Sequence, residues 1–347
     1  MALAEPLVYA ARAATLGGKD LAFLVSQLAG KYQVFGPTRK DGEIALGPVQ
    51  SLEDLELDYV TTLLPPKKYF YAPFDTIFSF HREGGVIHEE NLEERRVLFG
   101  LHPCDVNALL LLDRVFTGQY EDDRYKRKRE NTLIVGLNCN KPGENCFCSS
   151  FGTGPDLRRG YDLLLTNLGD RYLLEAGSGA GEELLHELRL KKAEPQAFLA
   201  KENVTRLAKG AIKKKINTDN LPKILNQNFG HGKWAELKEE CLACGACTIV
   251  CPTCYCFNVF DKLDLTLKHG ERQIVWDSCV LLEFGEVAMG GNFRRTRAAR
   301  IKQRIYHKLS YFETQYGALG CVGCGRCVTA CIKKIDPTAI VNAIRGE

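Results

Sequence analysis

The sequence predicts an α/β region that is followed by a mainly helical, cysteine-rich domain. Three observations indicate this order: short apolar runs alternate with a leucine-rich helical segment, a charged helical stretch comes next, and the cysteines crowd toward the end of the chain. No cysteine precedes Cys104, whereas eleven lie between Cys241 and the last one. We therefore expect an α/β domain over residues 1–180, a helical connector over 181–236 and a cysteine-rich domain over 237–347.

The composition is that of an ordinary soluble globular protein. The 347 residues, of which 45% are hydrophobic and 26% charged, can bury the core of two or three domains. The net charge of +3 gives no reason to expect nucleic acid as a partner. The longest apolar run, at 108–112, is too short to span a bilayer, and the first twenty residues lack a secretory signal. We therefore expect no membrane span, a cytoplasmic location and reduced cysteines that bind metal.

The α/β region opens with apolar residues at helical spacing over 20–28, followed by a strand from Tyr32 that ends in a Gly-Pro turn. Apolar runs at 95–101 and 132–137 predict two buried strands. The leucine-rich stretch 105–116 predicts a helix between them. Together these three segments predict a β-α-β unit.

The next segments predict a hairpin and a connector. Residues 161–166 and 171–175 are two short apolar runs separated by Asn-Leu-Gly-Asp, which is typical of a hairpin. From 181 to about 240 the sequence is charged and helical in pattern, and it includes the lysine run 213–215.

One cysteine motif occurs twice in the last third of the chain. The spacing C-x₂-C-x₂-C-x₃-C begins at Cys241 and again at Cys321, and it is the spacing of bacterial ferredoxins with two [4Fe–4S] clusters. Three thiolates on a tight loop bind three irons of one cubane, and Gly245 or Gly325 lets the backbone approach the sulfides. We expect the fourth cysteine to begin a helix that points away and to reach the other cluster. The sequence thus assigns Cys241, Cys244, Cys247 and Cys331 to cluster 1, and Cys321, Cys324, Cys327 and Cys251 to cluster 2.

Zinc is the alternative for these eight cysteines, but zinc sites usually take C-x₂-C pairs that are well separated in sequence. The second copy departs from the ferredoxin pattern at Ile332, where proline is usual; proline is not a ligand, so the predicted ligands are unaffected. The insert between the two copies is too long for a compact hairpin ferredoxin. Helical patterns at 281–290 and 295–309 favour a mainly helical, two-cluster ferredoxin-like domain.

Four further cysteines form a third constellation: Cys104, Cys139, Cys146 and Cys148. Cys104 and Cys139 lie at or just past the ends of neighbouring predicted strands. A Pro-Gly turn between Cys139 and Cys146 folds that loop back on itself, so the four thiolates can converge on a third [4Fe–4S] cluster. A zinc site or a set of buried thiols is the alternative. His102 is either a further ligand or a loop histidine with its hydrogen bonds satisfied.

The remaining cysteines are Cys254, Cys256 and Cys279, one thiolate short of a full ligand set. They could hold a further cluster with Asp277 as the fourth ligand, or pack as buried thiols near cluster 1. As a redox-active thiol or cluster site, they would instead make the chain an enzyme subunit.

Several segments of the chain resemble one family. These segments are Pro-Gly-Glu-Asn-Cys-Phe-Cys at 142–148 with the following Ser-Ser-Phe-Gly-Thr-Gly-Pro, the hairpin at 161–172, Cys-Pro-Thr-Cys-Tyr-Cys at 251–256, Trp-Asp-Ser-Cys at 276–279, 292–300 and 306–309. Over roughly residues 95–340 the chain resembles the β subunits of cytoplasmic sulfhydrogenases and the A subunits of anaerobic sulfite reductases.

The resemblance implies an iron–sulfur electron-transfer subunit of anaerobic metabolism. It implies a partner subunit that carries a flavin and oxidises NAD(P)H, with no flavin on this chain. It also implies a catalytic partner subunit, such as a hydrogenase, a sulfite reductase or a heterodisulfide reductase-type module.

Basic runs at 294–304, 124–129 and 213–215 have several interpretations. Near a cluster they would offset its negative charge, and elsewhere they would form solvated faces or subunit contacts. They lack interleaved aromatic residues, so an iron–sulfur protein of nucleic-acid metabolism is a weak alternative. The glycine-rich 177–181 lacks a Walker lysine and a G-x-G-x-x-G spacing, which argues against nucleotide binding. We therefore expect a non-catalytic electron conduit.

Overall fold

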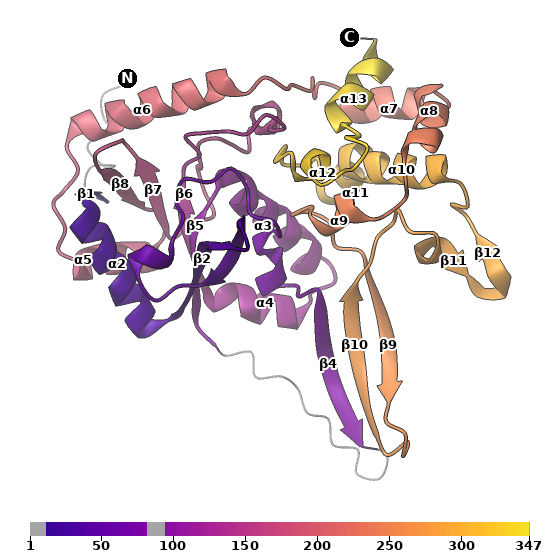
Figure 1. Cartoon of the computed structure of the whole chain (residues 1–347), viewed down its shortest axis with the longest axis horizontal. Helices are drawn as coiled ribbons and strands as arrows, with labels where there is room; N and C mark the ends of the chain where they lie inside the picture. Colours follow the sequence, from indigo (N-terminus) through magenta and orange to yellow (C-terminus); the bar gives the residue numbers. More distant parts are fainter. Residues whose placement is uncertain (1–11, 82–93, 347) are drawn as a thin grey trace.

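The computed structural model describes residues 12–81 and 94–346. These residues form a broad body from which a long three-stranded arm projects (Figure 1). In the part of the chain so described, no helix is long and apolar enough to cross a membrane.

A seven-stranded sheet organises the first half of the chain, in the order β1-β8-β7-β6-β5-β2-β3. Strands β7, β6, β5 and β2 are parallel to one another, and β1, β8 and β3 pair antiparallel toward the edges. The expected β-α-β unit is confirmed, and so is the hairpin, which is β7 and β8. The strands are β1 (Ala13–Leu16), β2 (Gln33–Lys40), β3 (Glu43–Pro48), β5 (Arg96–Leu101), β6 (Thr132–Leu137), β7 (Leu163–Asn167) and β8 (Tyr172–Ala176).

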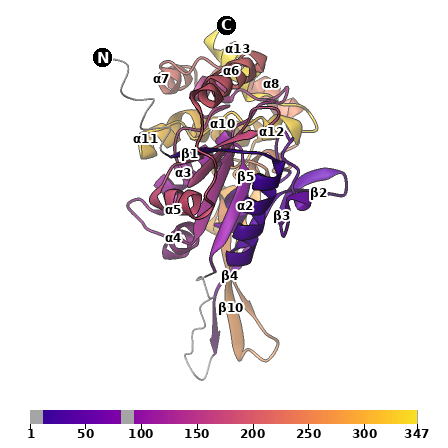
Figure 2. The same ribbon diagram turned by 90° about the vertical axis from the view of Figure 1, so that its left-hand side faces the viewer.

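Helices cover both faces of this sheet (Figure 2). Helix α2 (Gly18–Lys31) packs in one buried cluster with Val97 and Phe99 of β5, whereas α3 (Pro103–Phe116) packs in another with Leu98 of the same strand. This division follows from the alternation of side chains along a strand. Helices α4 (Asp123–Glu130) and α5 (Gly179–Glu187) complete the unit.

The charged segment that follows is helical, as its pattern predicts. It contains α6 (Pro195–Ala211), α7 (Leu221–Gln227) and α8 (Lys233–Glu240). The lysine run between α6 and α7 is not only a solvated face, because the Lys214 Nζ donates to Asp336 Oδ2 at 2.6 Å and to Asn145 Oδ1 at 2.7 Å.

The last third is helical only in part. Its helices are α9 (Ala246–Ile249), α10 (Arg297–Tyr306), a π-helical segment (His307–Tyr311), α11 (Phe312–Tyr316), α12 (Arg326–Thr329) and α13 (Pro337–Arg345). The prediction of a mainly helical insert between the two cysteine motifs is wrong where the chain forms two strands. These are β9 (Phe257–Leu263) and β10 (His269–Trp276), and both contain aromatic and β-branched residues.

The helix expected at 281–290 is also absent from the structure. This segment holds only the short 3₁₀ turns Glu283–Gly285 and Ala288–Gly290, with β11 (Glu286–Val287) between them, which pairs with β12 (Gly291–Asn292). Met289 has a φ of 66°, in the left-handed region, which a continuous right-handed helix cannot include.

The arm joins distant parts of the sequence. Strand β4 (Phe74–His81) pairs antiparallel with β10, which pairs in turn with β9. Part of the basic run in α4 holds β4, because Arg124 donates to the Thr76 carbonyl at 3.0 Å and Lys128 lies 3.0 Å from Asp75, whereas Arg127 is exposed.

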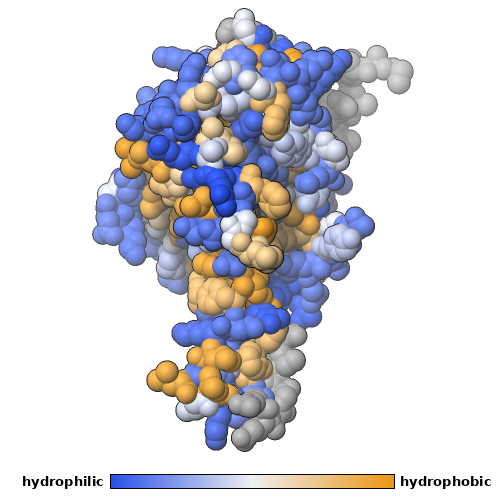
Figure 3. Space-filling view, turned by 90° about the vertical axis from the view of Figure 1, so that its right-hand side faces the viewer, coloured by the Kyte–Doolittle hydropathy of each residue, from blue (hydrophilic) through white to orange (hydrophobic). Residues whose placement is uncertain are grey.

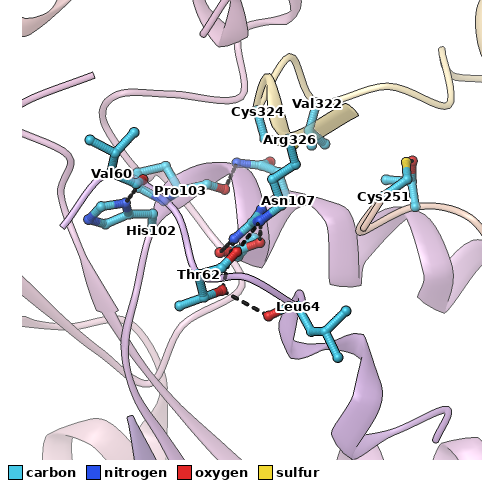
Figure 4. Close-up of polar contacts among 12 residues, drawn as sticks. Val60, Thr62, Leu64, His102, Pro103, Asn107, Cys251, Val322, Cys324 and Arg326 are labelled. Atoms are coloured by element: carbon cyan, nitrogen blue, oxygen red, sulfur yellow. Dashed lines mark hydrogen bonds and ion pairs between the residues drawn. The ribbon is translucent and has the colours of Figure 1, made fainter. Parts of the chain in front are cut away.

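A buried ion pair connects the α/β body to the second cysteine motif. Arg326, which lies between Cys324 and Cys327, donates to both carboxylate oxygens of Asp105 on α3, at 2.7 and 2.8 Å. It also donates to the Thr62 carbonyl at 2.9 Å, and Figure 4 shows it extending toward Thr62. Both charged side chains are at most 2% exposed, so each depends on the other to offset the cost of burying its charge.

Replacing Asp105 with asparagine should destabilise the fold strongly. The variant leaves a buried guanidinium without its counter-charge, which costs about 3–5 kcal/mol. We expect the melting temperature, measured by circular dichroism under anaerobic conditions, to fall by more than about 5 °C. Asp58→Asn is the matched control, because its ion pair with Lys141 is 66–71% exposed and contributes less than about 1 kcal/mol. Equal melting temperatures for the two variants would contradict this role of the pair.

Candidate functional site

The cysteines assigned to cluster 1 surround one pocket. Cys241, Cys244, Cys247 and Cys331 all line it. Gly245 takes a φ of 77° at the start of α9, which turns the chain back between the second and third cysteines. The amide of Ala243 donates to the Cys241 sulfur at 3.4 Å.

The cysteines assigned to cluster 2 surround a second pocket, which Cys251, Cys321, Cys324 and Cys327 line. The two motifs have matching local geometry: Gly325 has a φ of 76° at the start of α12, and the Gly323 amide lies 3.4 Å from the Cys321 sulfur. In each motif the last cysteine lines the pocket of the other motif, as the crossed assignment requires.

The predicted position of the fourth cysteine in each motif is wrong in one detail. The fourth cysteine of each motif does not begin a helix; Cys251 and Cys331 each follow a one-turn helix, α9 or α12. The short helix itself turns the chain toward the other pocket, so no longer helix is needed.

Two buried cations lie beside these pockets. Arg304 of α10 lines both pockets and is 6% exposed, and its Nε has no hydrogen-bond partner among the described residues. Burial alone would lower the pKa of Arg304, but the thiolate charges of Cys247 and Cys327 outweigh burial and hold it well above its usual range. Part of the basic run 294–304 is therefore internal.

Lys308 is the second cation. Its Nζ donates to the carbonyl and hydroxyl oxygens of Thr253, each at 2.7 Å. Burial opposes its charge, yet the thiolates of Cys251 and Cys254 raise its pKa above the ordinary value for lysine.

The third constellation also converges. Cys139 interacts electrostatically with Cys146 and Cys148, and Cys148 interacts with Cys104. Burial raises the pKa values of Cys139 and Cys148 to about 12, so these thiols need a bound cation or cluster to ionise at neutral pH.

This third set lies directly against the cluster 2 loop. The Phe147 amide donates to the Gly323 carbonyl at 2.8 Å, and the Cys146 sulfur lies 3.7 Å from the Cys324 carbonyl oxygen. A Cβ at Gly323 would lie 2.6 Å from the backbone of Phe147 and Cys148, so only glycine permits this approach.

His102 lies close to this set but is engaged elsewhere. Its Nδ1 lies 3.1 Å from the Val60 carbonyl, and its ring stacks on Tyr59 at 4.0 Å. Burial lowers its pKa to about 4, which keeps the imidazole neutral.

Sequence reasoning missed Arg326 and Lys67, whose charges matter only in the folded arrangement.

Cys254, Cys256 and Cys279 lie beyond cluster 2. Cys254 interacts electrostatically with Cys251, and Cys279 with Cys256. The interaction with the Cys279 side chain lowers the pKa of Cys256 to about 6. Asp277 contacts this group through its backbone, whose amide donates to the Cys256 carbonyl at 2.9 Å.

The residues around the two pockets fit iron–sulfur clusters. Four cysteines line the cluster 2 pocket and five line the cluster 1 pocket, because Cys327 lines both, and the buried Arg304 lies beside each; this is the donor chemistry of [4Fe–4S] sites. Over residues 12–81 and 94–346, no three His, Cys, Asp or Glu side chains are arranged to hold a single metal ion. A bound cluster would supply one-electron redox chemistry, while the protein sets its charge environment and excludes water.

Comparisons with known proteins agree with this geometry. The model of the 4Fe–4S dicluster domain family matches residues 240–335. Sulfhydrogenase 2 subunit beta of Pyrococcus furiosus is 37% identical over 318 residues, which are 90% of this chain and 92% of that protein. No solved structure gives a significant match. The expected family is thereby confirmed: the chain belongs to the sulfhydrogenase β-subunit family and carries an iron–sulfur dicluster domain in its last third.

Proposed function

We propose that the chain is a cytoplasmic electron-transfer subunit that relays electrons between a flavin-bearing, NAD(P)H-oxidising subunit and a catalytic redox subunit. The catalytic partner would be a hydrogenase, a sulfite reductase or a heterodisulfide reductase-type subunit, and the flavin would lie on the partner alone. The observation that carries the proposal is the serial arrangement of three cysteine sets in one chain. The family relation supports it, because the relative is named as a subunit of a sulfhydrogenase.

The proposed ligands are the two crossed sets of four cysteines and the third set. The loop of the third set contacts the cluster 2 loop, and Arg304 lines the pockets of clusters 1 and 2 together. Electrons would therefore pass from Cys104, Cys139, Cys146 and Cys148 through cluster 2 to cluster 1, or in the reverse direction. Cys244 is exposed, so cluster 1 would lie at the surface end of the series.

The arm supports an assembly with another subunit. It carries exposed apolar side chains, including Phe257, Val259, Leu263 and Leu265. Figure 3 shows apolar patches along the projecting part of the molecule, separated by a hydrophilic band. Exposed apolar patches of this kind are typical of a subunit contact. An intracellular location is consistent with fifteen free cysteines.

Iron analysis tests the number of clusters. The anaerobically purified chain should contain about twelve irons and twelve acid-labile sulfides. Cys148→Ser should lose about four of each, because one ligand of the third cluster is missing. Ser149→Ala, at the half-buried neighbouring position, is the control and should keep the full content, because its side chain is not a proposed ligand. About eight irons in the unaltered chain would contradict the third cluster.

Removing the Lys308 charge should lower the reduction potential of cluster 2. Reduction adds negative charge to the cluster, and a buried cation nearby stabilises this added charge. Lys308→Met should therefore shift the potential down by on the order of 100 mV. The potential is measured by a redox titration followed by electron paramagnetic resonance, with iron content as a check on the folded state. Lys302→Met on α10 is the control, since the Lys302 Nζ contacts Phe229 instead of a cysteine. An unchanged potential in Lys308→Met would contradict the proposed charge effect.

Co-purification tests the conduit itself. The full chain, expressed with its own assembly, should be isolated together with a flavoprotein. Reduced flavin on that partner should bleach the cluster absorbance of this chain. A chain that oxidised NAD(P)H and reduced a catalytic substrate without a partner would contradict the proposal.

A further inference from the structure

A basic cleft opens between the α/β body and the second cysteine motif. Two adjoining cavities of about 540 and 680 Å³ make up the cleft, and both are lined by Ser150, Gly152, Asp156 and Arg158. The basic side chains of the cleft come from three segments that lie far apart in the sequence: Arg114, Arg158, Arg159, Lys209 and Lys215. The fold therefore gathers five scattered cations on one concave surface.

The positive charge of the cleft is not neutralised from within. Over residues 12–81 and 94–346, the exposed side chains of Arg158 and Arg159 have no hydrogen-bond or ion-pair partner. Of the described residues in the walls of the cleft, only Asp156 is acidic, and its carboxylate lies 3.8 Å from the Lys201 Nζ. The cleft should therefore attract an anionic surface.

The cleft leads to cluster 2. Cys321, a proposed ligand of that cluster, is half-buried and lines both the cleft and the pocket of cluster 2. Two hydrogen bonds fix this wall, because the Thr153 hydroxyl donates to the Val322 carbonyl and the Arg114 guanidinium to the Tyr316 carbonyl, each at 2.8 Å. An electron delivered in the cleft would thus enter cluster 2 through the Cys321 sulfur, without crossing cluster 1 or the third set.

The cleft differs in character from the arm. Apolar side chains in its walls, such as Phe151 and Leu319, are only partly exposed, whereas Leu263 and Leu265 of the arm are exposed. Permanent subunit contacts are rich in apolar surface, while transient contacts between redox proteins are smaller and more polar. The arm therefore suits a permanent subunit, and the cleft suits a partner that binds and leaves.

The spread of the cations indicates a protein partner rather than a small anion. All five are exposed, and they line two cavities, so a single small ion would contact only a few of them. Exposed arginines and lysines steer an oppositely charged surface toward a site and hold it in register. An acidic protein with a redox cofactor near its surface can cover the whole cleft and place that cofactor close to Cys321.

We propose that the basic cleft docks an acidic one-electron carrier protein, which reduces cluster 2 through Cys321. The inference rests on the proposed function, because cluster 2 must be present to accept the electron. The step balances: the carrier loses one electron, cluster 2 gains it, and no bond forms or breaks. Cluster 2 would then receive electrons from two sources, the carrier and the flavin-bearing subunit.

Charge reversal in the cleft tests the docking. The probe is fully reduced flavodoxin, a small acidic protein that carries FMN. Mixed anaerobically with the full, oxidised chain in a stopped-flow instrument, it should bleach the cluster absorbance at a rate that falls as salt is added. The double variant Arg158→Glu/Arg159→Glu should lower the second-order rate constant at low salt by at least about tenfold and lose most of the salt dependence.

Two controls separate docking from damage to the clusters. Lys19→Glu reverses an exposed charge on α2, outside the cleft, and should keep the rate of the unaltered chain. Reduced methyl viologen, a small cation, should reduce the clusters of the double variant at least as fast as those of the unaltered chain. An equal iron content in all chains shows that the clusters are retained.

Binding of oxidised flavodoxin, measured by calorimetry at low salt, separates this inference from the proposed function. Unchanged binding and rate in the double variant would overturn the docking site, whereas the electron conduit would stand. A chain without iron that binds flavodoxin, and loses this binding in the double variant, would contradict the conduit and support the docking site. Binding of inorganic phosphate or single-stranded DNA by the cleft, with no binding of flavodoxin, would overturn the proposal.

Discussion

The buried ion pair between Asp105 and Arg326 is the constraint on which the arrangement of the cysteines depends. Asp105 follows Cys104 directly on α3, and Arg326 lies within the second cysteine motif. Two charges at most 2% exposed are tolerated only when they are paired, so the cluster 2 loop must lie against the α/β body in this one position. Gly323 then allows the 146–148 loop to reach the same place. A single electrostatic contact thus sets the order of the cysteine sets.

A second constraint is the charge of the clusters themselves. A cubane with four thiolates is anionic, and burying it is costly unless positive charge lies nearby. Arg304 between the two pockets and Lys308 beside Cys251 supply that charge. The same lysine also interacts electrostatically with Cys256. The stability of the clusters and their reduction potentials would therefore depend on the same few buried cations.

Local patterns predicted much of this molecule. Apolar periodicity predicted the β-α-β unit, because it depends on residues close in sequence. Cysteine spacing likewise gives an assignment of the eight cysteines to two clusters, which stays a prediction; the eight line two pockets, and Cys327 lines both. The arm was not predicted, since β10 becomes a central strand only when the distant β4 pairs with it. The Asp105–Arg326 ion pair could likewise not be predicted from sequence patterns, because its residues are 221 positions apart. The approach of the Cys256 and Asp277 backbones depends on the same hairpin, and spacing alone had suggested only an incomplete ligand set.

The central claim is that the cysteine sets hold clusters close enough to form one series. Electron paramagnetic resonance of the fully reduced chain tests it most directly, because neighbouring paramagnetic clusters broaden each other's signals. We predict a broad, spin-coupled spectrum that resolves into simpler signals when the chain is only partly reduced. Sharp signals from isolated clusters at full reduction, or a silent protein that contains zinc, would contradict the account.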